Sequence, residues 1–230
     1  MITKKDIPGL RQLWQQAFGD SDALLDKFFS LGFSPNRCNC VRSDDKIVAA
    51  LYWFDCSWQD KKVAYIYAVA THEAYRGRGL CRSLMEDTHE TLREQGYGGA
   101  VLVPADEGLV SLYAKFGYRS FCSVEKAAAP MENMPAAAKI SPAEYAQLRS
   151  SFLGENAIFQ DGTALDFLAT YGAFYKTPGG IYCGYREGNN FCFEEILGES
   201  FPSQGPSLQA MYLSLDGDPQ IPDYFAIPLN

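Results

Sequence analysis

Three arginines and two glycines gather within seven residues, in the stretch Arg76-Gly77-Arg78-Gly79-Leu80-Cys81-Arg82. A strand-like run from Val63 to Thr71 precedes them, and apolar residues at helical spacing follow from Leu80 to Leu92. Glycines let the backbone approach a ligand, while the free N–H groups and the dipole at a helix start attract negative charge. The stretch therefore predicts a site for a pyrophosphate group.

Three kinds of phosphate-binding loop look broadly like this one. A Walker A loop requires Lys-Ser/Thr after its second glycine, where this chain has Leu80-Cys81. A dinucleotide fingerprint requires a third glycine, where this chain has Arg82. The third kind is the R/Q-x-x-G-x-G/A loop of the GNAT acyltransferase superfamily. The stretch from Arg76 to Cys81 resembles it at every position except the last, where Cys81 replaces Gly or Ala.

A second motif lies about thirty residues further along the chain. Gly98 to Val103 is typical of a buried strand, and a short helix ending near Gly117 is expected after it. Within that helix, Leu112-Tyr113-Ala114-Lys115-Phe116-Gly117-Tyr118 resembles the closing motif of the superfamily, L-Y-x-K-x-G-F/Y. The two motifs occur in the family's order and at its separation, and the resemblance covers residues 1–125.

The resemblance implies an α/β fold with a mixed central sheet, in which two middle strands splay apart at a bulge. It implies a cofactor site for acetyl-CoA, with the pantetheine arm pairing with the backbone of Val69, Ala70 and Thr71. The pyrophosphate would lie on the loop formed by Arg76, Gly77, Arg78, Gly79, Leu80, Cys81 and Arg82. Tyr113 matches the family tyrosine that protonates the leaving sulfur.

The implied reaction is N-acyltransfer, in which an amine of a small molecule or peptide attacks the thioester directly. The general base stays open, because Glu73, Asp106 and Glu107 all lie near predicted strand ends. Tyr65 and Tyr67 share one strand face and either line the acceptor side or belong to the core. The alternative to an enzyme is a non-catalytic acyl-CoA sensor or interaction module, which would bind the cofactor without turnover.

Composition excludes several other classes. The 230-residue chain is 47% hydrophobic and 14% aromatic, as expected for a globular protein. A net charge of −8 argues against a nucleic-acid partner, and no apolar run is long enough to span a membrane. Seven cysteines without framework spacing suggest reduced thiols in a cytoplasm, and only two histidines are present, so no metal site is expected. The assembly state stays open, a homo-oligomer included.

The first half of the chain shows helix and hairpin patterns before the central strand. Thr3 and Asp6 form a capping-box pattern ahead of a helix that ends at Phe18, and a second short helix follows Asp22. In the superfamily these helices flank the acceptor cleft. A hairpin turning at Ser43-Asp44-Asp45 comes next.

The second half, residues 126–230, is predicted as a smaller α/β lobe. Residues 127–138 are linker-like in composition, helices are expected from Ser141 and over 163–171, and a hairpin over 180–197. Two more strands are predicted at 208–215 and 224–229. This order resembles the degenerate second lobe of the Eis group of acetyltransferases. By that resemblance the lobe walls the acceptor cleft without binding acetyl-CoA, and the terminal carboxylate, here of Asn230, is a candidate base.

Overall fold

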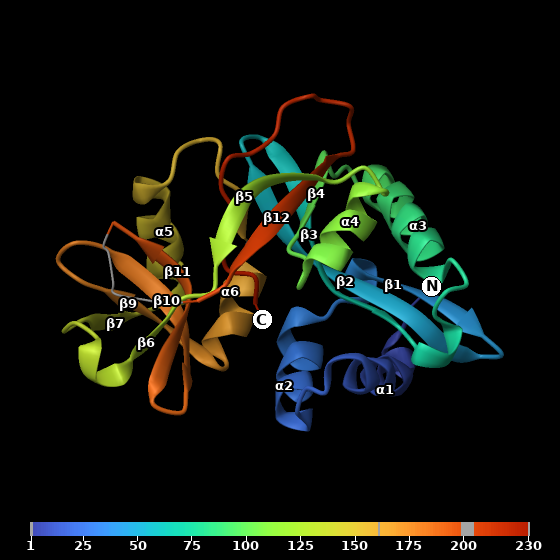
Figure 1. The fold of residues 1–230 in the computed structure, drawn as a ribbon, viewed down its shortest axis with the longest axis horizontal. Helices are drawn as coiled ribbons and strands as arrows, with labels where there is room; N and C mark the ends of the chain where they lie inside the picture. The colour runs from blue at the N-terminus through green and yellow to red at the C-terminus, as the bar shows by residue number, and fades with distance from the viewer. Residues whose placement is uncertain (1, 161, 199–204, 230) are drawn as a thin grey trace.

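The structure is a computed structural model that describes residues 2–160, 162–198 and 205–229. Two β-sheets form the molecule, one in each half of the view in Figure 1. The first has the strand order β1-β2-β3-β4-β12-β5, with β8 paired to β2. Its strands are β1 (Cys38–Ser43), β2 (Lys46–Trp58), β3 (Lys61–Thr71), β4 (Gly99–Leu102), β5 (Arg119–Glu125), β8 (Phe159–Gln160) and β12 (Ser207–Ser214). The mixed α/β fold predicted from the two motifs is confirmed.

Helices cover both faces of the first sheet. One face packs against α1 (Ile7–Phe18) and α2 (Asp22–Lys27), and the other against α3 (Leu80–Glu94) and α4 (Glu107–Ala114). Side chains of β2 alternate between these two cores, with Tyr52 and Phe54 in the first and Leu51 and Trp53 in the second. A strand covered on both faces must be apolar at successive positions, and that explains the continuous hydrophobic run of β2.

The second sheet is antiparallel in every pair, with the order β6-β11-β10-β9-β7. Its elements are β6 (Ala128–Pro130), β7 (Ala138–Ile140), α5 (Pro142–Phe152), α6 (Gly162–Ala169), β9 (Gly172–Lys176), β10 (Ile181–Glu187) and β11 (Asn190–Leu197). The predicted hairpin and both predicted helices are confirmed, and Ser141 caps α5 by accepting a hydrogen bond from the Glu144 N–H.

Two predictions for this half were wrong. Residues 127–138, predicted as a linker, include the edge strand β6 and the first residue of the edge strand β7. The partners of these strands, β11 and β9, follow much later in the sequence. Residues 224–229, predicted as a strand, form only one isolated bridge, between Tyr224 and Ala157. Backbone φ angles of +60° at Ile227 and Leu229 are incompatible with an extended strand there.

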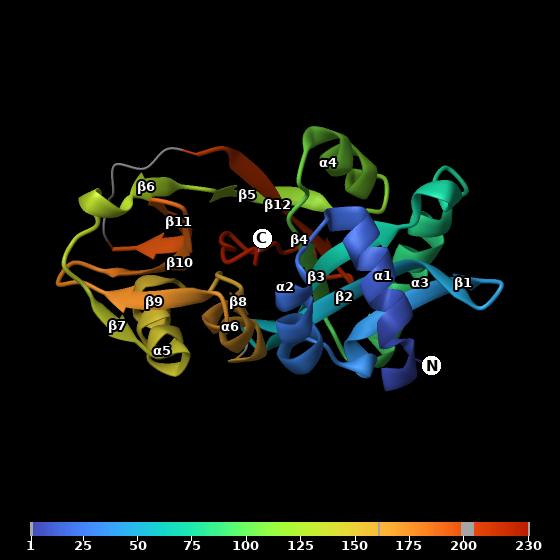
Figure 2. The same cartoon turned by 90° about the horizontal axis from the view of Figure 1, so that it is seen from below.

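The predicted strand at 208–215 is present as β12, but it lies in the first sheet. It pairs antiparallel with β4 on one side and with β5 on the other. After Glu125 the chain builds the second sheet, adding only the short β8 to the first sheet on the way, and then returns to fill the position between β4 and β5. Figure 2 shows β12 beside β5 and the chain end lying between the two sheets. The division into residues 1–125 and 126–230 stays a prediction.

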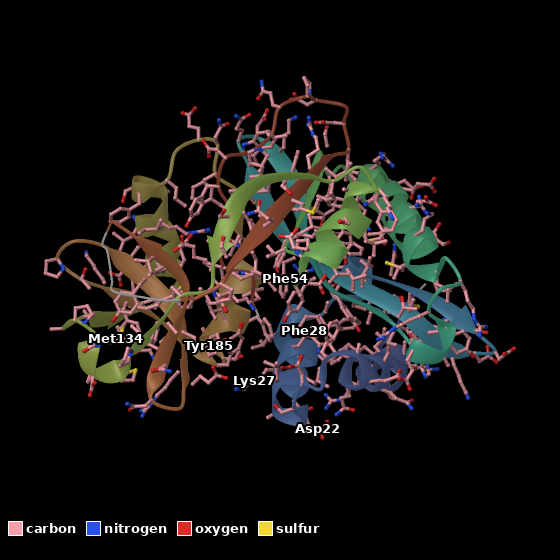
Figure 3. All side chains as sticks on the ribbon, in the orientation of Figure 1. Asp22, Lys27, Phe28, Phe54, Met134 and Tyr185 are labelled. Carbon is pink, nitrogen blue, oxygen red and sulfur yellow. The ribbon has the colours of Figure 1, made fainter. Side chains whose placement is uncertain are left out.

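One apolar core runs from α1 through the first sheet to α6 and the second sheet. Phe28, at the end of α2, contacts both Phe54 of β2 and Phe167 of α6, with ring centroids 6.2 and 5.6 Å apart. Figure 3 shows Phe28 and Phe54 near the middle of the molecule. Lys27 adds a polar link, since its ammonium donates to the carbonyl of Thr170 at 2.8 Å. In the described part of the chain, no helix is long and apolar enough to cross a membrane.

Candidate active site

The centre of the first sheet is open along one edge of β3. Strands β3 and β4 pair in parallel only at Val63, Ala64 and Tyr65, although β3 continues to Thr71. On its other side, Tyr67 and Ala70 of β3 pair with Tyr52 and Ala50, so two residues of β3 lie opposite one of β2. Ala68 within this bulge has a φ of +50°. The splayed strands and the bulge predicted from the resemblance are confirmed.

A cavity of about 310 Å³ lies at the opening between β3 and β4. Helix α1 and the loop after it contribute Trp14, Phe18 and Asp20, and β3 contributes its residues from Tyr65 to Val69. Tyr113 of α4 and Leu229 near the chain end also line the cavity. The cavity thus brings together residues from widely separated parts of the sequence. Tyr65 and Tyr67 line it and also pack in the apolar core, so their two predicted roles do not exclude each other.

Tyr113 is 6% exposed and lies among aromatic rings. Its ring centroid is 6.1 Å from that of Phe116 and 6.0 Å from that of Tyr118. Burial raises the pKa of the Tyr113 phenol, and the nearby Cys81 raises it further. The phenol is therefore protonated at neutral pH and able to donate a proton into the cavity.

The loop before α3 has the conformation that its glycines predict. Gly77 and Gly79 have φ angles of +75° and +80°, and a Cβ at either would meet nothing within 4 Å. Arg76 donates to the Thr71 carbonyl at 3.1 Å and Arg78 to the Ala74 carbonyl at 3.0 Å, so both arginines brace the loop itself. The first hydrogen bond within α3 joins Ser83 N–H to the Gly79 carbonyl, so the amides of residues 80–82 precede the helical ladder.

Three residues were predicted to pair with the pantetheine arm, Val69, Ala70 and Thr71. Of these, Val69 lines the cavity. Ala70 and Thr71 continue β3 beyond it, toward the loop at Arg76. Cys81 and Arg82 lie in the first turn of α3, where the Arg82 guanidinium carbon is 5.0 Å from the centroid of the Phe116 ring. The predicted cofactor residues thus follow one another along the strand end, the loop and the first turn of α3.

Cys81 is partly buried in the first turn of α3. Burial raises the pKa of its thiol, although the helix start and the nearby arginines would favour the thiolate. All seven cysteines are free thiols in the structure. Within the described residues, no group of three or more potential ligands could hold a metal ion.

Asp20 is the residue of this site that sequence reasoning missed. Its carboxylate is half-buried, lines the cavity and accepts a hydrogen bond from the Trp14 indole N–H at 2.8 Å. Among the described residues it takes part in no ion pair with Lys, Arg or His. One feature of the sequence could have indicated Asp20. It directly follows Gly19, which ends α1 with a φ of +74°, and so it lies between the two helices expected to flank the acceptor.

None of the three candidate bases lines the cavity. Asp106 instead caps α4, accepting from the Leu109 N–H at 2.8 Å, while Glu73 and Glu107 are exposed. His72 accepts from the Ala74 N–H and lines a separate cavity near the start of α1. The Asn230 carboxylate lies outside the described residues, and its role as a base stays a prediction.

A mixed sheet opened at a central bulge, with a glycine-arginine loop at a helix start beside it, defines the class of GNAT acyltransferases. The comparison with protein families agrees. The model described as an acetyltransferase (GNAT) domain matches residues 1–121, and the chain belongs to this family. The protein is therefore an acetyltransferase.

The relatives extend this likeness. The uncharacterized N-acetyltransferase YhbS of Escherichia coli strain K12 is 29% identical over 124 residues, which cover 49% of this chain and 68% of that protein. A GCN5-related N-acetyltransferase from Anabaena variabilis has a TM-score of 0.70 at 15% identity, covering 93% of this chain and 71% of that one. Eis1 from Mycobacterium abscessus has a TM-score of 0.61 at 14% identity, covering 87% of this chain and 58% of that one. The two structures share the fold with this chain across both sheets.

Proposed function

We propose that the protein transfers the acetyl group of acetyl-CoA to a cationic amine, with Tyr113 as general acid and Asp20 as the group that attracts the acceptor. One observation carries the proposal: the opening between β3 and β4 forms a single cavity that both side chains line. A thioester reaching this cavity along β3 would meet a proton donor and an acceptor-binding carboxylate together.

The donor would bind along β3 and the loop after it. The unpaired edge of β3 beyond Tyr65 offers backbone groups to the amides of the pantetheine arm, much as an added strand would. The left-handed Gly77 and Gly79 and the free amides at the start of α3 offer an anion site for the pyrophosphate. Strand edge and loop are joined through Thr71, whose carbonyl accepts from Arg76.

The chemistry follows from these positions. The bound ammonium first gives one proton to solvent, and the neutral amine nitrogen then attacks the thioester carbonyl, so that a C–N bond forms and an oxyanion develops that backbone amides stabilise. The C–S bond breaks, and Tyr113 gives its proton to the leaving thiolate. Solvent takes the second amine proton and returns one proton to Tyr113. Holding both reactants in one small cavity removes most of the entropic cost of their encounter.

The acceptor side indicates a positively charged amine. Asp20 keeps a carboxylate at the cavity without a basic partner among the described residues, beside the Trp14, Phe18 and Tyr67 rings. A carboxylate next to aromatic faces attracts an ammonium group by charge and by cation–π contact. Small amines and the amine of a peptide both meet this requirement.

Calorimetric titration with acetyl-CoA tests the donor site. We expect the wild type to bind and Gly79→Trp to lose binding, since the indole would occupy the open space over the loop. Gly96→Trp is the matched control, because Gly96 also has a positive φ, +78°, and open surroundings, but follows the far end of α3. No binding by the wild type would contradict the proposal, and binding without any turnover of amines would favour an acyl-CoA sensor.

A further inference from the structure

The segment Tyr224–Leu229, the terminal segment, runs between the two sheets without belonging to either. Buried backbone N–H and C=O groups need partners, and a segment outside a sheet must find them individually. Here the partners are side chains and backbone groups of both halves of the molecule, and most are themselves buried.

The first sheet holds the end of the terminal segment through two tyrosines. The Tyr65 hydroxyl donates to the Pro228 carbonyl, and the Tyr67 hydroxyl donates to the Leu229 carbonyl at 2.8 Å. Both tyrosines and Leu229 line the cavity that contains Tyr113. The terminal segment is thus fixed directly at the proposed acceptor site.

Strand β11 of the second sheet holds the same segment through Glu194. Its backbone carbonyl accepts from the Ile227 N–H at 3.2 Å, and its Oε2 accepts from the Leu229 N–H at 3.2 Å. Glu194 is 5% exposed. A carboxylate fixed at this depth restrains the same end of the segment that the two tyrosines hold.

Glu195, the next residue of β11, is the centre of a buried polar cluster. It pairs with Arg149 at 2.7 Å, their side chains being 0% and 1% exposed, and accepts from the Tyr224 hydroxyl at 2.9 Å. Arg149 also donates to Gln160 at 2.7 Å, and Gln160 donates in turn to the carbonyls of Ala226 and Ile227. The cluster therefore holds the beginning and middle of the terminal segment.

The backbone of the segment requires such restraint. Ile227 and Leu229 both have a φ of +60°, a conformation that is strained for a non-glycine residue and persists only where its surroundings impose it. Residues of this kind concentrate at ligand-binding sites. The fold maintains a strained segment at the position where it closes the cavity.

We propose that Gln160, Glu194 and Glu195 are positioning residues, which hold the terminal segment so that Leu229 forms a wall of the acceptor cavity. Residues of β8 and β11 thereby control acceptor binding without touching the acceptor. This inference rests on the proposed function and adds to it the means by which residues 126–230 act on the reaction.

Gln160→Met tests the proposal, because it removes the hydrogen bonds to the terminal segment at a residue that does not line the cavity. With phenethylamine as the acceptor probe, we expect its KM to rise about tenfold, the scale of one lost buried hydrogen bond, and the KM for acetyl-CoA to stay unchanged. Amide hydrogen exchange at Ile227 and Leu229 should accelerate. Tyr224→Phe is the second variant, for use if Gln160→Met does not fold. It keeps the aromatic ring but loses the hydroxyl that donates to Glu195, and it should change the phenethylamine KM in the same direction.

Phe191→Leu is the matched control, because Phe191 is buried in β11 but packs in the separate cluster with Tyr182 and Phe193. It weakens the second sheet without removing a bond to the terminal segment, and should leave the phenethylamine KM and the amide exchange unchanged. Equal effects of Phe191→Leu and Gln160→Met, or none from Gln160→Met and Tyr224→Phe, would overturn the positioning role alone. Absence of CoA release by the wild type would overturn the proposed function and this proposal with it.

Discussion

Tyr113 and Asp20 show how differently two residues of one site can be inferred. Tyr113 lies in a motif with fixed spacing, so its role could be proposed from seven consecutive residues. Asp20 lies in a short loop rich in Asp and Ser, where a carboxylate is most often a turn or capping residue. Its place at the cavity depends on the packing of α1 against β3, and no local pattern contains that information.

Removing the Tyr113 hydroxyl should slow the reaction without weakening donor binding. A general acid contributes about 100-fold or more, so Tyr113→Phe should lower kcat by at least about 100-fold and leave acetyl-CoA affinity intact. Tyr118→Phe is the control, since that neighbouring hydroxyl contacts His89 at 3.0 Å and not the cavity. Steady-state CoA release measures both variants, and an unchanged kcat in Tyr113→Phe would refute the assignment.

Neutralising Asp20 should weaken acceptor binding selectively. A hydrogen bond to a charged group contributes about 1.5–3 kcal/mol, so Asp20→Asn should raise the KM for phenethylamine at least about tenfold and leave that for acetyl-CoA unchanged. Asp22→Asn is a suitable control, because that carboxylate is exposed and paired with Arg11. Equal KM values for the two variants would exclude Asp20 as the acceptor-binding group.

Among the elements of the first half of the chain, the sequence predicted the main helices and the strands β1 to β4, but not β5. The loop from Arg76 to Arg82 and the strand before it follow from glycine spacing and an apolar run, both local features. The failed strand at 224–229 has the same apolar character as β12. What distinguishes them is pairing, because β12 has partners on both sides and the terminal segment is bound mainly by side chains.

Helix α3 carries a buried group that should make stability depend on pH. Burial and the nearby Arg93 lower the pKa of His89 from 6.5 to about 4. As the pH falls through 6.5, the imidazole of His89 takes up a proton in the unfolded chain. In the folded protein the same imidazole stays neutral until about pH 4. The stability contributed by neutral His89 is therefore complete above pH 6.5 and is lost on acidification toward pH 4.

From this group alone, the free energy of unfolding should fall by about 2 kcal/mol between pH 7 and pH 5. Urea unfolding at the two pH values measures the loss, which His89→Gln should remove. His72→Gln, at the other histidine of the chain, should retain it. The role of His89 would be contradicted if the wild type were equally stable at both pH values, or if His89→Gln kept the full loss of stability.

At the scale of the whole molecule, the position of β12 could not be predicted. Its sequence indicates a strand. Which strands β12 pairs with depends on contacts between residues about ninety positions apart along the chain, and the local pattern of polar and apolar residues does not encode such contacts. The finding matters because β12 lies between β4 and β5, and without it both would be exposed edges. The second half of the chain is thus needed to complete the first sheet.

A fragment of residues 1–125 should therefore not unfold cooperatively. Ser207 pairs with Glu125, and the Lys126 N–H donates to the Pro206 carbonyl, so a two-residue Asn-Gly turn joining Lys126 to Pro206 would make β5 and β12 a hairpin. A chain of residues 1–126, Asn-Gly and 206–215 should regain a cooperative transition in chemical denaturation followed by circular dichroism. Cooperative unfolding of residues 1–125 alone would show that β12 is dispensable.

The most direct test of the proposed acetyl transfer is mass spectrometry of the products formed from acetyl-CoA and phenethylamine. The proposed reaction predicts N-acetylated amine and free CoA in equal amounts with the wild type and with Gly96→Trp, and neither product with Gly79→Trp. CoA release without acetylated amine would contradict transfer to an amine. Equal turnover by Gly79→Trp would contradict the donor site on the loop before α3.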